Sequence, residues 1–300
     1  MNDFDELING GFGVCYKDEP MSKHTTFKVG GPADLLIMPE SEQDIIDIIK
    51  YCNKKVIPFI VIGNGSNLLV TDKGIRGVVI KLGKNFSDIK FVGDRVFAQS
   101  GALLSTVSKK SFKNGLTGME EISGIPGSIG GAMVMNAGAY GGEISFIVEK
   151  VRCLNKKGEL LEFEKDEMEF GYRQSVVSKR DLIVLDVEIK LEKGNMDEIY
   201  EKFKDYDNRR TTKQPLDKNS AGSTFKRPVG NYASKLIDEA GLRGFRYKGA
   251  QVSEKHCGFI INIDDATFEE VRTLITKVQS IVKDKFDVEL ETEVKIIGEM

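Results

Sequence analysis

The chain has 300 residues, of which 40% are hydrophobic and 30% are charged, and its formal net charge is -3. This length predicts about two domains with ample core, and the mixed charge disfavours a nucleic-acid partner, which would need a basic surface. The acidic N-terminal stretch lacks a signal-peptide pattern, and no run reaches the roughly 18 apolar residues of a membrane span. The sequence therefore predicts a cytoplasmic protein with no membrane partner.

The cysteines and histidines give no sign of a metal site or of disulfides. The four cysteines are Cys15, Cys52, Cys153 and Cys257. They are scattered, with no C-x-x-C pair, so we expect reduced thiols that pack as small apolar side chains. The only histidines, His24 and His256, lie in no metal-ligand spacing. No metal is predicted.

The first half of the chain predicts an α/β unit followed by hairpins. Residues 41–53 form a predicted helix, because an S-x-x-D capping box starts at Ser41 and apolar residues follow on one face. The run VIPFIVIG, residues 56–63, predicts a buried strand directly after it. Residues 87–100 and 147–163 alternate in short runs around turn residues, which indicates antiparallel hairpins.

The middle of the chain holds the predicted domain boundary. Residues 103–114 predict a helix that ends at Gly115, and residues 182–191 predict a strand. A helix that starts near Met196 then leads into the charged segment 207–220. That segment is long, polar and contains proline, which is typical of a boundary between domains.

Two further helices are predicted in the last part of the chain. One runs from about Tyr232 to Ala240 with Gly241 at its C-terminal end. The other begins at Thr267, which opens a T-x-x-E capping box before a long amphipathic stretch. Helices and strands in this arrangement predict the α+β class.

The most unusual stretch is GIPGSIGGAMVMNAGAYGGE, residues 124–143, with seven glycines in twenty positions. Glycine permits positive φ and lets a ligand come close to the backbone. The apolar residues in between argue against a flexible linker, and the number of glycines favours a ligand cradle over a simple turn. A second segment, GNGSN, covers residues 63–67. Neither fits a dinucleotide fingerprint or a P-loop, but rows of free backbone N–H groups can hold a pyrophosphate.

Several long motifs, in a fixed order, resemble the UDP-N-acetylenolpyruvoylglucosamine reductase family from about residue 20 to the end. The segments similar to its FAD-binding part are TTFKVGGPAD (25–34), VIGNGSNLLV (61–70), the glycine-rich stretch 124–143 and GYRQS (171–175). Those similar to the remainder are NSAGSTFKRP (219–228) and ELETEVKIIG (289–298). No tyrosine-bearing loop follows GYRQS, as in the shorter subclass of the family.

The resemblance implies an α+β fold with a vanillyl-alcohol-oxidase/PCMH-type FAD-binding domain of two subdomains and a C-terminal α+β substrate-binding domain. We expect the FAD-binding domain at residues 1–205, with subdomains of about 1–83 and 84–205, and the substrate domain at 206–300. Whether the extreme C-terminus returns to the first subdomain stays open. The implied reaction passes a hydride from NADPH through FAD to UDP-N-acetylglucosamine enolpyruvate, giving UDP-N-acetylmuramate for peptidoglycan. We expect a monomer.

Three residues match catalytic positions of the family. Ser223 corresponds to the general acid, which makes chemical sense because hydride addition leaves a carbanion that is basic enough to take a hydroxyl proton. Arg173 and Glu293 match the pair on the substrate carboxylate, where a guanidinium and a protonated carboxyl stabilise growing charge. Without the family context, Ser223 would be a turn residue and the pair a surface ion pair.

The remaining expected contacts also come from the resemblance. The expected FAD-binding residues are Gly63, Asn64, Gly65, Ser66, Asn67, Gly124, Pro126, Gly127, Ser128, Gly130, Gly131, Asn136, Ala137 and Gly138. The expected substrate-binding residues are Lys213, Arg227 and Tyr172. Lys213 suits the UDP diphosphate, whereas Arg227 stands where some relatives have Asn. Either Lys255 or His256 could contact the nucleotide.

Two alternatives to the reductase remain open at this point. One is another FAD-linked oxidase or dehydrogenase of the same flavin fold, which would explain the glycine motifs equally well. The other is a flavin- or UDP-sugar-binding module without turnover. The matches at Ser223, Arg173 and Glu293 argue against both.

Overall fold

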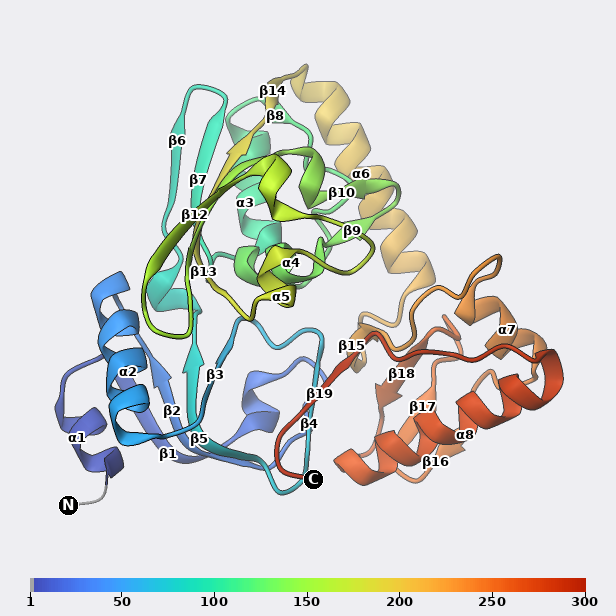
Figure 1. Cartoon of the computed structure of the whole chain (residues 1–300). Helices are drawn as coiled ribbons and strands as arrows, with labels where there is room; N and C mark the ends of the chain where they lie inside the picture. Colours follow the sequence, from blue (N-terminus) through green and yellow to red (C-terminus); the bar gives the residue numbers. More distant parts are fainter. Residues whose placement is uncertain (1–2) are drawn as a thin grey trace. The chain divides into compact units, whose positions relative to one another are not determined.

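The computed structural model describes residues 3–300. The chain divides into two compact units, each built from separated parts of the sequence. Unit 1 comprises the residues up to Lys17, Leu35–Asn64 and Gly77–Arg209, and unit 2 comprises Asp18–Asp34, Gly65–Arg76 and Arg210–Met300. Four elements run from one unit into the other: β1 (Val14–Pro20), β2 (Pro32–Met38), β5 (Ile75–Lys81) and α6 (Met196–Lys213) (Figure 1).

The first part of unit 1 is a four-stranded sheet in the order β1-β2-β5-β3, with α1 (Asp3–Asn9) and α2 (Glu42–Lys55) beside it. β3 (Phe59–Ile62), which follows α2 directly along the chain, runs parallel to β5. The predicted capping box of α2 is confirmed: the Ser41 hydroxyl accepts the Asp44 N–H at 3.1 Å, and the Asp44 carboxylate accepts the Ser41 N–H at 2.9 Å.

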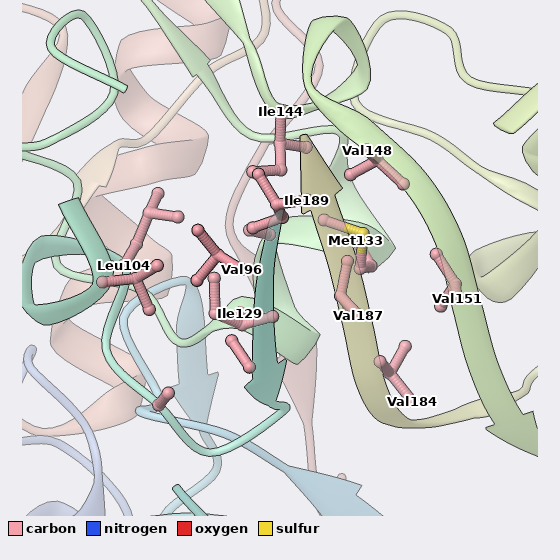
Figure 2. Close-up of a cluster of buried hydrophobic side chains, with 14 of the residues drawn as sticks. Val96, Leu104, Ile129, Met133, Ile144, Val148, Val151, Val184, Val187 and Ile189 are labelled. Carbon is pink, nitrogen blue, oxygen red and sulfur yellow. The ribbon is translucent and has the colours of Figure 1, made fainter. Parts of the chain in front are cut away.

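The second part of unit 1 is an antiparallel sheet. Its strands, in order, are β12 (Leu160–Glu164), β11 (Val148–Leu154), β13 (Ile183–Lys190), β7 (Arg95–Gln99) and β6 (Ile89–Val92). Both predicted hairpins are confirmed, because β6 pairs with β7 and β11 pairs with β12. The helices α3 (Leu104–Lys113) and α4 (Ile129–Met135) contribute Leu104, Ile129 and Met133 to the core formed with the valines and isoleucines of these strands (Figure 2).

Short elements complete unit 1. They are η2 (Lys84–Phe86), β8 (Leu116–Thr117), β9 (Gly138–Ala139), β10 (Gly142–Glu143), η3 (Ile144–Phe146), η4 (Lys165–Met168), α5 (Val176–Lys179) and β14 (Glu192–Lys193). β9 and β10 form a small hairpin, in which Glu143 pairs with Gly138. This hairpin belongs to the glycine-rich stretch singled out in the sequence.

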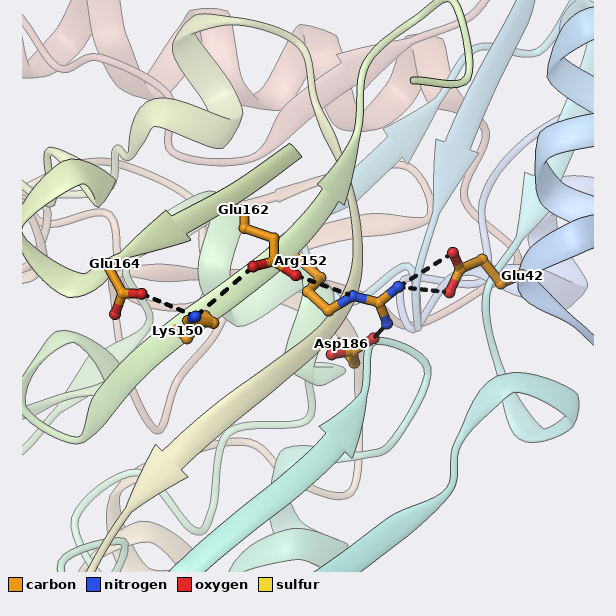
Figure 3. A network of polar contacts seen from close by, with 6 residues as sticks. All are labelled: Glu42, Lys150, Arg152, Glu162, Glu164 and Asp186. Carbon is orange, nitrogen blue, oxygen red and sulfur yellow. Dashed lines mark hydrogen bonds and ion pairs between the residues drawn. The ribbon is translucent and has the colours of Figure 1, made fainter. Parts of the chain in front are cut away.

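An ion-pair network joins α2 to the antiparallel sheet of unit 1 (Figure 3). Arg152 on β11 donates to Asp186 at 2.6 Å and to Glu42, in the first turn of α2, at 3.0 Å. Lys150, on the same strand, pairs with Glu164 at 2.9 Å. Burial raises the pKa of the Asp186 carboxyl, and the Arg152 guanidinium opposes that rise. The network therefore holds the two parts of unit 1 together.

Unit 2 contains a second antiparallel sheet, with the strand order β15 (Asn219–Ser223), β18 (Phe259–Asn262), β17 (Ala250–Val252) and β16 (Arg246–Tyr247). Two helices, α7 (Ala233–Glu239) and α8 (Phe268–Phe286), contribute to its core. The predicted capping box at Thr267 is confirmed. Three short elements complete the unit: η1 (Met21–His24), β4 (Leu68–Val70) and β19 (Lys295–Ile297), the last two paired in parallel.

The structure corrects one local expectation. α6 continues through Lys213, seven residues into the polar segment 207–220 at which the helix was expected to end, because charged residues are good helix formers and Asp205 pairs with Arg209 one turn on at 2.8 Å. Within residues 3–300, no helix has the length and apolar character needed to cross a membrane.

Candidate active site

Two glycine-containing loops meet in unit 1. Asn64 donates its side-chain amide to the Pro126 carbonyl at 2.6 Å. A Cβ atom at Gly63 would clash with the Ser128 hydroxyl, so a side chain there would force this hydroxyl to move. In the described part of the chain, the backbone amides of Gly63, Asn64, Gly127 and Ser128 donate no hydrogen bond. Backbone N–H groups without a partner are donors of the kind that can hold a pyrophosphate.

Other glycines of the long stretch are explained by packing inside unit 1. The Gly130 N–H donates to the Ser100 carbonyl at 2.8 Å, and a Cβ at Gly130 would lie 2.9 Å from the Ser100 Cβ. A Cβ at Gly138 would lie 2.9 Å from the Glu143 side chain. Gly131 has room, because its nearest neighbour would be 3.6 Å away. The stretch thus serves close packing as well as any ligand.

The rest of GNGSN lies in unit 2. Gly65 has φ +68°, and a side chain there would clash with the His24 carbonyl. The Asn67 side chain donates to the Glu293 carbonyl at 3.2 Å, and the Lys295 N–H donates to the Asn67 carbonyl at 2.9 Å. The segment that contains Ser66 is therefore fixed beside the residues that lead into β19.

Ser223 and Glu293 are brought together in unit 2 by the residue that follows Ser223. The Glu293 N–H donates to the Thr224 carbonyl at 2.8 Å, and Phe225 pairs with Thr292 in an isolated bridge. Ser223 ends β15 directly after Gly222, which has φ +76°. The Ser223 residue is exposed, and its hydroxyl has no hydrogen-bond partner among the residues that the structure describes. This hydroxyl can therefore act on a bound molecule.

Arg173 and Tyr172 lie at the tip of a tight turn in unit 1. Gly171 and Gln174 exchange backbone hydrogen bonds of 3.1 and 3.3 Å across this turn. Arg173 has φ +56°, at a position where glycine or asparagine would be favoured. The guanidinium donates to the Gly138 carbonyl at 3.4 Å and lies over the Tyr172 ring at 5.2 Å. The turn and the glycine-rich stretch are thus in direct contact.

The expected substrate-binding cations lie in unit 2. Lys213 is the last residue of α6 and is exposed, and its ammonium group contacts no polar group of residues 3 to 300. Arg227 lies over the ring of Tyr232 at 3.9 Å. Lys255 donates to the Thr211 carbonyl, two residues before Lys213, at 2.5 Å.

His256 differs from Lys255 in its surroundings. Its Nδ1 accepts the Gly258 N–H at 3.1 Å, and its ring packs edge-on against Phe259 at 5.0 Å between centroids. Burial lowers the pKa of the imidazole, and the nearby Arg243 lowers it further. The sequence left open whether Lys255 or His256 contacts the nucleotide. In the structure, the His256 ring is held inside the fold, whereas the Lys255 side chain extends to α6.

A cavity of about 410 Å³ lies in unit 1 beside the β9–β10 hairpin. Its lining residues are Gly118, Glu121, Ile122, Tyr140, Gly141, Gly142, Glu143, Phe146 and Ile147. The ring of Tyr140 packs on that of Tyr206 at 5.2 Å, and the Tyr206 hydroxyl donates to Glu121 at 3.2 Å. Burial raises the pKa of Tyr206, as does the Glu121 carboxylate. The sequence analysis did not identify the two carboxylates of this cavity, Glu121 and Glu143, although Glu143 lies in the glycine-rich stretch 124–143.

The expected site residues fall into two groups. Unit 1 holds Arg173, Tyr172, Gly63, Asn64 and the residues from Gly124 to Gly138. Unit 2 holds Ser223, Glu293, Lys213, Arg227 and the residues from Gly65 to Asn67. Over the described range 3–300, no group of three or more His, Cys, Asp or Glu side chains could hold a metal ion.

Comparison with known proteins defines the class. The family model described as "FAD binding domain" matches residues 33–164, and that described as "UDP-N-acetylenolpyruvoylglucosamine reductase, C-terminal domain" matches residues 214–297. A glucose oxidase variant of Phl p 4 has a similar fold, with a TM-score of 0.50 at 14% identity over 65% of this chain and 45% of its own. The predicted fold class, a PCMH-type FAD-binding domain with a C-terminal α+β domain, is confirmed. The class is that of FAD-dependent oxidoreductases.

Relatives along the whole chain narrow this class to one family. The UDP-N-acetylenolpyruvoylglucosamine reductase of Clostridioides difficile (strain 630) is 52% identical over 282 residues, which cover 94% of this chain and 93% of the relative. The crystal structure of UDP-N-acetylenolpyruvylglucosamine reductase from Thermus caldophilus has a TM-score of 0.81 at 34% identity, covering 93% of this chain and 97% of its own. The chain belongs to the UDP-N-acetylenolpyruvoylglucosamine reductase family.

Proposed function

We propose that this chain reduces UDP-N-acetylglucosamine enolpyruvate to UDP-N-acetylmuramate in peptidoglycan synthesis, with FAD as bound cofactor and NADPH as reductant. The observation that carries the proposal is the exposed Ser223, whose neighbour Thr224 accepts the Glu293 N–H, in a chain similar to such reductases over 94% of its length. The chemistry that FAD would supply here is hydride transfer from NADPH to the enolpyruvyl double bond.

The protein would hold FAD mainly through its backbone. The free amides of Gly63, Asn64, Gly127 and Ser128 suit a pyrophosphate, which needs several donors but no lysine or arginine at the contact. The proposed FAD-binding residues are those expected from the sequence: Gly63, Asn64, Gly65, Ser66, Asn67, Gly124, Pro126, Gly127, Ser128, Gly130, Gly131, Asn136, Ala137 and Gly138. Of these, Gly130 and Gly138 also have a packing role, because an added Cβ would lie 2.9 Å from Ser100 and Glu143, respectively.

The chain's own residues would manage the proton and the growing charge. Ser223 donates its hydroxyl proton to the carbanion left after hydride addition. Arg173 and Glu293 bind the substrate carboxylate, where negative charge accumulates in the transition state. Lys213 binds the diphosphate through its ammonium group, and Tyr172 and Arg227 are further substrate contacts.

Other expectations extend this proposal. The substrate domain would begin near residue 206. The mixed charge of the chain, with a formal net charge of -3, supports a protein without a nucleic-acid partner, and we place it in the cytoplasm as a monomer without a membrane partner. The product feeds the cell wall, so the activity would serve cell shape and division.

Oxidation of NADPH by the purified protein tests the proposal. We expect a yellow protein whose flavin is released by acid, with rapid loss of NADPH absorbance only when the enolpyruvyl sugar nucleotide is present. Equal NADPH oxidation without this substrate would instead favour an oxidase of the same fold. Flavin binding without any turnover would favour the binding-module alternative.

A further inference from the structure

The side chain of Asn136 lies at the centre of a buried hydrogen-bond network in unit 1. The residue ends α4 with φ 41° and ψ 61°, and only 2% of its surface is exposed. Its amide nitrogen donates to the Glu143 carboxylate at 2.8 Å and to the Gly171 carbonyl at 3.2 Å. Its carbonyl oxygen accepts the Ser145 N–H at 3.3 Å. The side chain thus makes three hydrogen bonds within the protein.

The bond to Gly171 fixes one end of the turn that carries Arg173. The other end is fixed by Ser175, which is fully buried and donates its hydroxyl to the Val134 carbonyl at 3.3 Å. Between these two anchors, Arg173 keeps its positive φ and reaches the Gly138 carbonyl at 3.4 Å. All three contacts come from residues 134–138, the end of α4 and the residues that follow it.

A left-handed arginine is an unfavourable conformation that persists only where the surroundings hold it. Here the surroundings include two buried side chains, Asn136 and Ser175, each of which donates a hydrogen bond to a main-chain carbonyl. We propose that Asn136, with Glu143 orienting its amide, is a positioning residue for Arg173. This inference rests on the proposed function, in which Arg173 binds the substrate carboxylate.

Glu143 has a defined part in this arrangement. Its carboxylate accepts the Asn136 amide at 2.8 Å and the Ser145 hydroxyl at 3.2 Å. These bonds settle which end of the Asn136 side chain faces Gly171, because a carboxylate can accept but not donate. Asn136 therefore presents its N–H₂ group, and not its oxygen, to the Gly171 carbonyl.

The test exchanges donors and acceptors without changing shape. In Asn136→Asp, position 136 loses both donated bonds and places a carboxylate next to Glu143, so this variant should be unstable. In Asn136→Asp/Glu143→Gln, the amide introduced at position 143 donates to the carboxylate introduced at position 136 and to the Ser145 hydroxyl, which changes from donor to acceptor. The Ser145 N–H keeps an acceptor at position 136. The bond to the Gly171 carbonyl is then missing, because two acceptors face each other there. This double variant therefore removes the hydrogen bond to Gly171, in the turn that carries Arg173, while positions 136 and 143 stay hydrogen-bonded to each other.

We expect the double variant to fold, with a lower apo-protein melting temperature than wild type because two buried acceptors face each other. Its half-reactions are therefore compared with wild type below the melting temperature of both proteins and at saturating FAD. Reoxidation of the flavin by the enolpyruvyl substrate should slow by about 10- to 100-fold, because a small misplacement of a binding group has an effect of that order. In an Arg173→Ala background, the same double substitution should change reoxidation by less than about twofold, since no guanidinium is left to misplace.

The outcomes separate the inference from the proposed function. If Arg173→Ala is slow and the double variant reoxidises at the wild-type rate, Asn136 does not position Arg173. Equal slowing in the wild-type and Arg173→Ala backgrounds would also overturn the inference, because the effect would not pass through the guanidinium. If Arg173→Ala alone reoxidises normally, the role proposed for Arg173 fails and the inference fails with it.

Discussion

Asn64 donates its side-chain amide to the main-chain carbonyl of Pro126 at 2.6 Å and so joins two loops that lie 62 positions apart in the sequence. Each loop brings two backbone amides that donate no hydrogen bond to another described residue, at Gly63 and Asn64 on one side and at Gly127 and Ser128 on the other. Anion binding by backbone amides depends on their common orientation. The Asn64 contact is therefore the bond that holds the proposed pyrophosphate site in shape.

Replacing Asn64 by Ala should weaken FAD binding more than it weakens the fold. One hydrogen bond contributes about 1 kcal/mol to stability, whereas the proposed site needs both loops in place. Flavin content after gel filtration and the melting temperature of the apo-protein would measure the two effects. Asn53→Ala is the matched control, because Asn53 makes a similar bond of 2.7 Å to the Lys156 carbonyl. Equal flavin loss in both variants would contradict the prediction.

Replacement by alanine should lower the free energy of unfolding at Gly130 and raise it at the neighbouring Gly131. In Gly130→Ala, the added methyl lies 2.9 Å from the Ser100 Cβ, and such overpacking costs about 1–3 kcal/mol. In Gly131→Ala, the nearest atom is 3.6 Å away, so the better helix propensity should add up to about 1 kcal/mol. Urea unfolding of the apo-proteins measures both. Similar stability of the two variants would show that Ser100 can shift to accommodate the added methyl group.

Lys213→Ala should raise KM for the sugar nucleotide while kcat changes little. A contact far from the reacting carbon binds the ground state and the transition state alike. Loss of a charged hydrogen bond predicts a rise in KM of about 10- to 100-fold. Steady-state kinetics would test this, with Lys202→Ala as control, since Lys202 is an exposed lysine on the same helix. A fall in kcat alone would instead place Lys213 in the chemical step.

Ser223→Ala should leave reduction of the flavin by NADPH nearly intact and slow its reoxidation by the substrate. A general acid is needed only once the hydride has left the flavin, and its loss typically costs about 10²- to 10⁴-fold. Ser223→Cys should recover part of the rate, because a thiol can donate a proton from nearly the same place. Rapid-mixing absorbance follows each half-reaction separately.

The alternative for Ser223 is a structural role at the end of β15. It predicts lower stability, an effect on both half-reactions, and no advantage of Cys over Ala. Normal reoxidation in Ser223→Ala would remove Ser223 from the proton transfer.

His256 should make the fold less stable in mild acid. Its pKa is lowered by burial, so the unfolded state, with a pKa of about 6.5, binds more protons than the folded state as the pH falls. The free energy of unfolding therefore decreases from about pH 6.5 down to the folded pKa, and its slope is positive with pH in that window. His256→Gln should flatten this part of the curve in urea titrations from about pH 7.5 to 5. Since His24 is present in both proteins, an unchanged slope would exclude His256 as the cause.

Much of the local structure could be predicted from the sequence. The capping boxes at Ser41 and Thr267 specify their own helix starts, because the bonds involved span only three residues. Alternation and turn residues likewise predicted the β6–β7 and β11–β12 hairpins. Motif order identified the family, since long motifs in a fixed order seldom arise by chance.

Contacts between distant segments were decided only by the tertiary structure. The sequence predicted that the helix starting near Met196 ends at the polar segment 207–220, whereas the helix propensity of charged residues and their pairing carry α6 through Lys213. The glycine-rich stretch pointed to a ligand, yet Gly130 is explained by Ser100, and Asn136 bonds to Gly171 across 35 positions. The sequence shows where a small residue would allow another segment or a ligand to approach the backbone closely. Which partner approaches depends on packing that brings remote segments together, so the partners of these residues appear only in the folded chain.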